Sequence, residues 1–445
     1  MGRTGSASLP LHGGRVPEWL ASRMARLGRV LTEAIVLQYG RDEMLRRLSH
    51  PFWFQSLGAV MGMDWHSSGI TTSVLGALKR GLAPVQDELG LYVCGGRGRH
   101  SRRTPEELRA LGDRIGLDGD GLTRASKLVA KVDSAAVQDG YALYLHGFVV
   151  TREGHWTVVQ QGMNDREGLA RRYHWLSEGL TSFVDEPHAA IDGRPQGEIL
   201  NMTDRRAVPS RDAQVALARE PGVVLRELHR FRRHPPHLAL PAHHEVRTSD
   251  VLLRRLAATL AAAADRAPHD FAELLLTPGV GARTVEALAL VAEVMHGAAS
   301  RFSDPARFSY AHGGKDGHPF PVPIDVYDRT LTVMRQALEQ AKLGNDERLQ
   351  ALRRLDDAAR RLERVVSMDA EQFERLLQRE NERSLLYSGR TVSGSAPPKA
   401  ARSVIPREEQ LSLDYEPAAA ASRRPMTPET LLACPMAPSS GRPGP

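Results

Sequence analysis

The chain has 445 residues, of which 41% are hydrophobic and 25% charged, the usual composition of a soluble globular protein. Its two cysteines, Cys94 and Cys434, are too few for a disulfide framework or a cysteine-rich zinc ribbon. No run of about 18 apolar residues is present, which argues against a membrane span, and without a secretory pattern we expect a cytoplasmic protein. The net charge of +6 favours a polyanionic partner. Only six of the 59 basic residues are lysines, a skew that GC-rich coding also produces.

Residues 1–180 have the pattern of a mixed α/β domain. Helical spacing runs from Leu20 to Leu37, and Thr104 followed by Pro105 predicts a helix start with threonine as the N-cap. Two β-rich runs, Tyr141–Val150 and Trp156–Gln161, are separated by a short polar loop, which predicts a β-hairpin.

The rest of the chain reads as helical with irregular connections. We expect an irregular Pro-, Arg- and His-rich connection over 181–245, a helical domain over 246–345, charged helices over 346–388 and a disordered tail over 389–445, where ten of the 28 prolines lie. The predicted fold class is therefore α+β. Within the helical domain the expected helices are Val251–Ala264, Phe271–Leu276 and Thr284–Met295.

The most specific motif is the turn Pro278–Gly281, which lies between two apolar helical runs. Gly279 and Gly281 allow a tight turn, and Val280 is expected to pack between the two helices. The N–H groups at the start of the second helix, with Arg283 in its first turn, suit phosphate oxygens. The segment resembles the helix-hairpin-helix family of nucleic-acid backbone binders. We therefore predict contacts from Gly279, Val280, Gly281, Arg283 and Thr284; an ordinary helix–helix corner is the alternative.

The DNA glycosylase superfamily also has such a hairpin, followed by a Gly/Pro-rich stretch and a catalytic aspartate. In this chain the stretch His312–Pro323 precedes Asp325 and Asp328, either of which would take the place of that aspartate. The gap is longer than in that superfamily, and its lyase lysine would fall near Arg283, which forms no Schiff base. We keep a glycosylase-like enzyme using Asp325 as an alternative.

Polar residues cluster between positions 60 and 175. Asp64 and His66, with Asp133 or Asp139, would suit a divalent metal that activates water. This is the list expected of a metal-dependent nuclease, although no spacing proves it and the metal is not identified. The alternative is a set of turn and capping residues.

Two basic runs would suit a phosphate backbone. The run Gly95–Arg103, which includes Arg97 and Arg99, has the composition of a glycine-rich cationic loop. The run His229–His237 carries Phe231 between arginines, where it would stack on a base. Solvated surface segments are the alternative for both runs.

Four segments occur in a characteristic order: Met1–Gly5, Asp64–Gly69, Gln160–Asn164 and Pro278–Gly281. Together they resemble the prokaryotic domain-of-unknown-function family 763, over about residues 1–340. That family has no established reaction, so the resemblance implies no catalytic residue.

These patterns predict a nucleic-acid-binding protein, and DNA is a better candidate for its partner than RNA. We do not expect a membrane as a partner. We expect a DNA or RNA processing or repair factor, with a metal-dependent nuclease as the enzymatic form. The alternatives are a non-enzymatic nucleic-acid-binding or scaffold protein that self-associates through its C-terminal helices, and an enzyme acting on a small molecule.

Overall fold

The computed structural model describes residues 9–10, 18–63, 69–233, 253–306, 324–340, 344, 347–355 and 357. The chain divides into two compact units, Met1–Asp414 and Tyr415–Pro445, and all described residues belong to the first. The predicted disordered tail and most of the predicted charged helices at 346–388 lie outside the described residues, as do Asp64 and His66.

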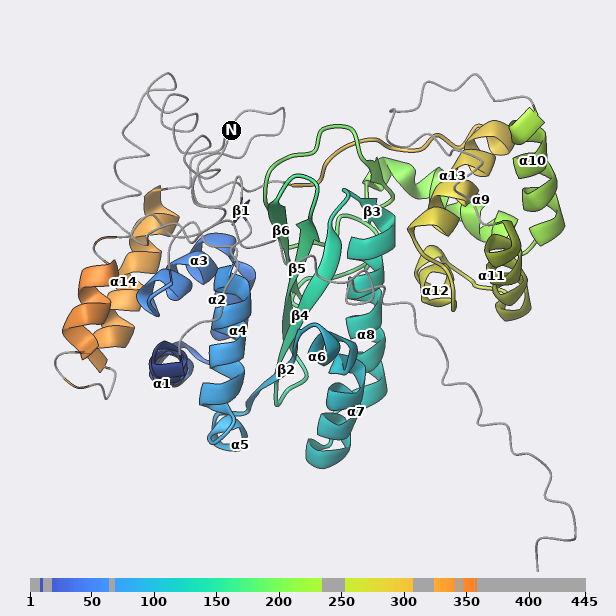
Figure 1. Ribbon diagram of the computed structural model, residues 1–445. Coiled ribbons are helices and arrows are strands. Elements are labelled where there is room, and N and C mark those ends of the chain that lie inside the picture. Colours follow the sequence, from blue (N-terminus) through green and yellow to red (C-terminus); the bar gives the residue numbers. More distant parts are fainter. Residues whose placement is uncertain are drawn as a thin grey trace, which may run out of the picture. The chain divides into compact units, whose positions relative to one another are not determined.

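A six-stranded antiparallel sheet is the centre of the described structure (Figure 1). Its strands are β1 (Leu9–Pro10), β2 (Leu91–Arg97), β4 (Ala142–Thr151), β5 (Trp156–Asn164), β6 (Leu169–Leu176) and β7 (Ala190–Asp192). The spatial order is β1-β6-β5-β4-β2, and β7 pairs with β6. The predicted hairpin is confirmed as β4 and β5, in which Val150 pairs with Trp156. A second, two-stranded sheet joins β3 (Val137–Gln138) to β8 (Leu200–Asn201).

The sheet is buried on both faces, which is why β4 contains the unbroken apolar run Phe148–Val150. One face carries Leu145, Val149 and Val159 into a core with the first helices of the chain. These helices are α1 (Glu18–Tyr39), α2 (Arg41–Ser49), α3 (Pro51–Val60) and α4 (Gly69–Leu82), followed by the short α5 (Gln86–Leu89). The predicted helix at 20–37 is thus confirmed as α1.

Helices also cover the other face, where Tyr92, Phe148 and Val158 belong to a second core. The elements on this side are α6 (Arg99–Arg102), α7 (Thr104–Ile115), α8 (Gly119–Lys131) and the π-helix η1 (Val132–Ala136). The predicted helix at Thr104 is present, but the capping prediction is wrong. Thr104 Oγ1 donates to the Ser101 carbonyl at 2.8 Å, and the N-cap position is Arg103.

The second core continues from the sheet into a helical region that includes Leu274 and Leu288. This region contains η2 (Arg205–Ala207), α9 (Val208–Ala218), α10 (Pro221–Arg233), α11 (Leu253–Arg266), α12 (Phe271–Leu276) and α13 (Ala282–His296). The helices predicted around 251–295 are confirmed. The predicted irregular connection over 181–245 is wrong where the chain forms α9 and α10. The physical reason is that apolar side chains at helical spacing, such as Val224, Leu228 and Phe231 in α10, are buried in this core.

Helix α14 (Ile324–Gln340) packs against α1. Its side chains Met334, Ala337 and Leu338 lie in the same core as α1–α4. The helical residues 347–355 also join that core through Ala351 and Leu355. The α+β class is confirmed, while the remaining predicted domain boundaries stay predictions.

Candidate functional site

The hairpin between α12 and α13 consists of Thr277–Gly281. Val280 is fully buried in the second core, and its N–H donates to the Thr277 carbonyl at 3.1 Å, which closes a tight turn. Gly279 is exposed and has a φ of +84°, a conformation that favours glycine. The structure therefore places Val280 inside and Gly279 outside, as the motif predicts.

Gly281 has a different position in the turn. Its φ of −146° and ψ of −170° are extended values open to any residue, so the backbone does not itself require glycine there. Gly281 is the N-cap residue of α13, and no side chain caps the helix. Ala282 and Arg283 are the first two residues of α13, so the helix contains no preceding carbonyl to which their N–H groups could donate. These N–H groups are left for an acceptor outside the helix.

Charge at the start of α13 comes from Arg283, whose side chain is 63% exposed. Its guanidinium lies 3.3 Å from the carboxylate of Glu286, a largely buried residue one turn further along the helix. Thr284 differs from the prediction, because it is 5% exposed and its N–H donates to the Gly281 carbonyl. Thr284 and Val280 therefore shape the turn from inside and present no side chain to a partner.

Two long-range hydrogen bonds fix the hairpin to α8 and the start of α13 to β3. Lys131, the last residue of α8, donates through Nζ to the Val280 carbonyl at 2.6 Å. The side-chain amide of Gln138 donates to the Ala282 carbonyl at 2.9 Å. These donors satisfy the carbonyls of Val280 and Ala282, and they do not occupy the N–H groups of Ala282 and Arg283.

Asp133, one of the predicted catalytic residues, lies in the π-helix η1 and is completely buried. Its Oδ2 accepts hydrogen bonds from the Gln160 amide and, at 3.0 Å, from the Trp175 indole. Its Oδ1 lies 2.5 Å from Nε2 of His188, whose side chain is 7% exposed. The carboxylate is therefore held from three sides by donors of the protein itself.

A chain of hydrogen bonds continues from Asp133 through Gln160 to His146 and Ser126. Because an ionised carboxylate only accepts, Gln160 turns its Nε2 to Asp133 and its Oε1 to Nδ1 of His146, 2.6 Å away. Nδ1 of His146 then carries the proton, and Nε2 accepts from the Ser126 hydroxyl at 2.9 Å. Burial lowers the pKa of His146 to about 4, so the ring is neutral near pH 7. All four side chains are buried, which favours a structural network over contact with a substrate.

Asp139, the second predicted carboxylate, belongs to a separate buried group around Arg171. The guanidinium of Arg171 lies 2.9 Å from Asp139 and 2.7 Å from Asp304, and the Tyr173 hydroxyl donates to Asp139 at 2.6 Å. Burial raises the pKa of Asp139 against the opposing effect of Arg171. Burial lowers the pKa of Arg171, but Asp304 and Asp139 more than reverse this, so its pKa lies well above the usual value. The group fastens the segment after α13 to β6.

The two described residues of the predicted metal site, Asp133 and Asp139, lie in separate hydrogen-bonded groups. Asp133 bonds to Gln160, whereas Asp139 bonds to Arg171 and Tyr173. Asp64 and His66 lie outside the described residues. Within the described parts of the chain, no group of three or more His, Cys, Asp or Glu side chains is arranged to hold a metal ion. The divalent metal therefore remains a prediction that rests on the sequence.

Strand β6 carries further buried polar side chains on its other face. Arg172, which is completely buried, donates through Nε to Thr71 at 3.0 Å and through Nη2 to Gln55 at 2.8 Å. His174 lies on the same face, 3.1 Å from the Leu48 carbonyl, and burial keeps its pKa well below the usual value. Strict alternation along β6 sends Arg171 and Tyr173 to one face and Arg172 and His174 to the other.

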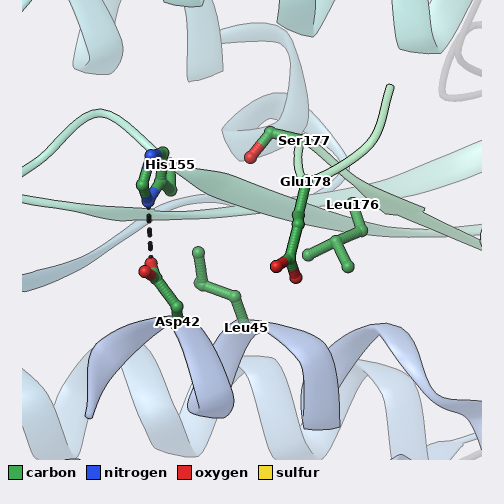
Figure 2. Close-up of a pocket in the computed structure, with 6 residues that line it drawn as sticks. All are labelled: Asp42, Leu45, His155, Leu176, Ser177 and Glu178. Atoms are coloured by element: carbon green, nitrogen blue, oxygen red, sulfur yellow. Dashed lines mark hydrogen bonds and ion pairs between the residues drawn. The ribbon is translucent and has the colours of Figure 1, made fainter. Parts of the chain in front are cut away.

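A small surface pocket lies between α2 and the β4–β5 loop, and none of the predicted site residues lines it (Figure 2). Nδ1 of His155 lies 2.8 Å from Asp42, and Glu178 is held by Arg46 through two hydrogen bonds. Both carboxylates thus already have a basic partner. The remaining lining residues are Leu45, Leu176 and Ser177.

The run Gly95–Arg103 forms regular structure where the composition predicts a loop. Arg97 ends β2, and Arg99 begins α6; both are exposed. Gly95 has a φ of +86°, and a Cβ there would lie 2.2 Å from the His146 carbonyl oxygen, so close pairing with β4 requires glycine. The glycines therefore serve strand packing, while the arginines face solvent. Phe231 of the second basic run is 6% exposed and belongs to the core, so the prediction that it stacks on a base is wrong.

The described residues define an α+β protein in which helices cover both faces of an antiparallel sheet and a glycine hairpin docks on one of those helices. Residues 5–322 match the family model described as "Protein of unknown function (DUF763)", and the chain belongs to this family. No curated protein matches the chain significantly. No solved structure does so either. No helix in the described part of the chain is long and apolar enough to cross a membrane.

Proposed function

We propose that this protein binds the phosphate backbone of nucleic acid, DNA in preference to RNA, through the hairpin between α12 and α13. The observation that carries the proposal is the placement of the turn. Val280 is completely buried, while Gly279 and Arg283 are exposed beside a helix start that no side chain caps.

The chemistry of this surface suits a phosphate oxygen. The N–H groups at the start of α13 are hydrogen-bond donors, and the helix dipole adds a partial positive charge at the same end. Arg283 adds a full charge on a side chain that is 63% exposed, which a phosphate would share with the buried carboxylate of Glu286 3.3 Å away. Because the donors are backbone groups and one arginine, the contact fixes position without selecting sequence.

Sequence-independent binding of this kind fits a DNA processing or repair factor. The proposal assigns no reaction, because Asp133 and Asp139 are engaged by donors within the protein. A glycosylase-like role for Asp325 stays a prediction: the side chain lies outside the described residues, and the helix that carries it, α14, packs on α1.

The test is equilibrium binding of a fluorescein-labelled DNA duplex to the full chain at several salt concentrations. We expect binding that weakens steeply with salt, and a loss of roughly tenfold in affinity on Arg283→Glu. Arg26→Glu on α1 is a matched control, because Arg26 is 58% exposed and also lies 3.3 Å from a glutamate. Failure of the chain to bind DNA or RNA at low salt, or equal affinities for the two variants, would overturn the proposal.

A further inference from the structure

One side of α8 carries basic side chains toward the hairpin. Arg124 and Lys127 are exposed, and Lys131, which is buried and bonds the hairpin, follows on the same side of the helix. The spacing of three and four residues places the three on one face. We call Arg124, Lys127 and Lys131 the α8 ridge.

The hairpin lies at the C-terminal end of the α8 ridge. Lys131 Nζ touches the Val280 carbonyl, and α12 packs against α8. With a rise of about 1.5 Å per residue, Arg124 lies about 10 Å along the axis of α8 from Lys131, a length that exceeds the separation of neighbouring phosphates in one DNA strand.

Further basic residues lie beyond the other end of the α8 ridge. Thr123 Oγ1 donates to the Pro105 carbonyl at 2.9 Å, which fixes the start of α7 beside Arg124. Arg102 and Arg103, which immediately precede α7, are both exposed. Of the acidic residues nearby, Glu106 lies 3.9 Å from Arg103, and Asp120 pairs with Arg109 at 2.9 Å. Exposed basic side chains thus extend from Arg102 and Arg103 to Arg124 and Lys127.

The geometry points to the α8 ridge as a second phosphate-binding surface, which takes the backbone of duplex DNA where it runs on from the hairpin. This inference rests on the proposed function and extends it: the hairpin anchors one phosphate, and Arg124 and Lys127 contact the next ones along the strand. Because α8 is already a formed helix, its exposed arginine and lysine side chains reach phosphate oxygens of the DNA without any loop having to become ordered.

Duplex DNA fits this surface better than a single strand does. Proteins that hold single strands stack bases on exposed aromatic rings. Among the described residues the large hydrophobic side chains that are exposed are Leu37, Tyr39, Val208, Val294, Met295 and Leu349, and none of these lies on α6, α7 or α8. The α8 ridge thus offers charge without a stacking platform.

The salt dependence of binding tests the inference, with Arg124→Ala/Lys127→Ala compared with Arg26→Ala/Arg80→Ala. The control removes two arginines, 58% and 55% exposed, from α1 and α4 on the other side of the sheet. Because each lost phosphate contact lowers the slope of log K against log salt by about 0.9 for a duplex, we expect the ridge variant to lower it by about 1.8. We expect the control to leave it unchanged. Circular dichroism and thermal unfolding confirm that both variants are folded.

The outcomes separate this inference from the proposed function. An unchanged slope in the ridge variant, with a loss of affinity still seen for Arg283→Glu, overturns the α8 ridge and leaves the hairpin proposal standing. Equal or tighter binding of a single strand, with the same loss in the ridge variant, overturns the assignment to duplex DNA. A wild-type chain that binds no nucleic acid overturns both.

Discussion

The ammonium group of Lys131 lies 2.6 Å from the carbonyl oxygen of Val280, a residue 149 positions later in the chain. Val280 is completely buried, and Lys131 is 8% exposed. The bond therefore joins the glycine turn to the end of α8 in a place that water hardly reaches, where a hydrogen bond from a charged donor is expected to matter. The position of the hairpin therefore depends on α8, one of the helices that cover the sheet.

Replacement of Lys131 by methionine tests this connection. Lys131→Met keeps a long apolar side chain but leaves the Val280 carbonyl without its donor, so we expect a loss of about 1.5–3 kcal/mol in the free energy of unfolding. Urea denaturation followed by circular dichroism measures it. Lys127→Met, on the exposed face of the same helix, is the control and should change stability by less than about 0.5 kcal/mol. Equal effects of the two substitutions would show that the bond is unimportant.

The turn itself depends on Gly279. Gly279→Ala places a Cβ at a φ of +84° and 2.7 Å from the Thr259 hydroxyl, and we expect a loss of about 1–2 kcal/mol. Gly279→Asn should cost less, since asparagine adopts this conformation more readily than alanine. Chemical denaturation of both variants compares them. If alanine is tolerated as well as asparagine, the positive φ is not a constraint on the turn.

The buried histidine in β4 makes stability depend on pH. The pKa of His146 is lowered from 6.5 to about 4 in the folded chain, mainly by burial. As the pH falls, the histidine is therefore protonated first in the unfolded chain. Burial of the neutral ring contributes fully to the free energy of unfolding above pH 6.5. This contribution, up to about 3 kcal/mol, is lost as the pH falls toward 4.

The variant His146→Gln isolates this contribution, because glutamine stays neutral throughout. Wild type should lose about 3 kcal/mol more than the variant between pH 7 and pH 4, as measured by urea unfolding at each pH. Parallel pH profiles would contradict the burial of a neutral ring.

The role of Asp133 can be separated from catalysis by two substitutions. Asp133→Asn retains an acceptor for Gln160 and Trp175, and His188 can change tautomer to meet the new amide, so we expect a cost of about 1–2 kcal/mol. Asp133→Leu leaves all three donors unsatisfied and should cost about 3–5 kcal/mol. Thermal unfolding distinguishes them. Stability near the wild-type value in Asp133→Leu would instead indicate that the carboxylate is kept for chemistry.

The elements that local pattern dictates could be predicted from the sequence. The hairpin of β4 and β5 and the helices around the Pro278–Gly281 turn follow from periodicity and turn residues. Strand β6 could not be found in this way, because adjacent arginines usually indicate a solvated segment. Arg171 and Arg172 are buried only because partners distant in sequence, Asp304 on one face and Thr71 on the other, meet them.

The same limit applies to the candidate site. Asp133 and Asp139 were identified from local sequence, but their partners His188 and Arg171 come from a loop and a strand that no local pattern connects to them. Helices α9 and α10 were missed because they lie in a segment, 181–245, that is rich in Pro, Arg and His, whereas their buried apolar residues determine their structure.

Amide hydrogen exchange of the full chain, with and without duplex DNA, tests the central claim most directly. The claim is that the N–H groups at the start of α13 bind phosphate. Peptides that cover Gly279–Val285 should exchange more slowly when DNA is bound, and peptides from α1 should be unchanged. Binding of DNA with no slowing in the hairpin peptides would contradict the account, because the phosphate contact would then lie elsewhere on the protein.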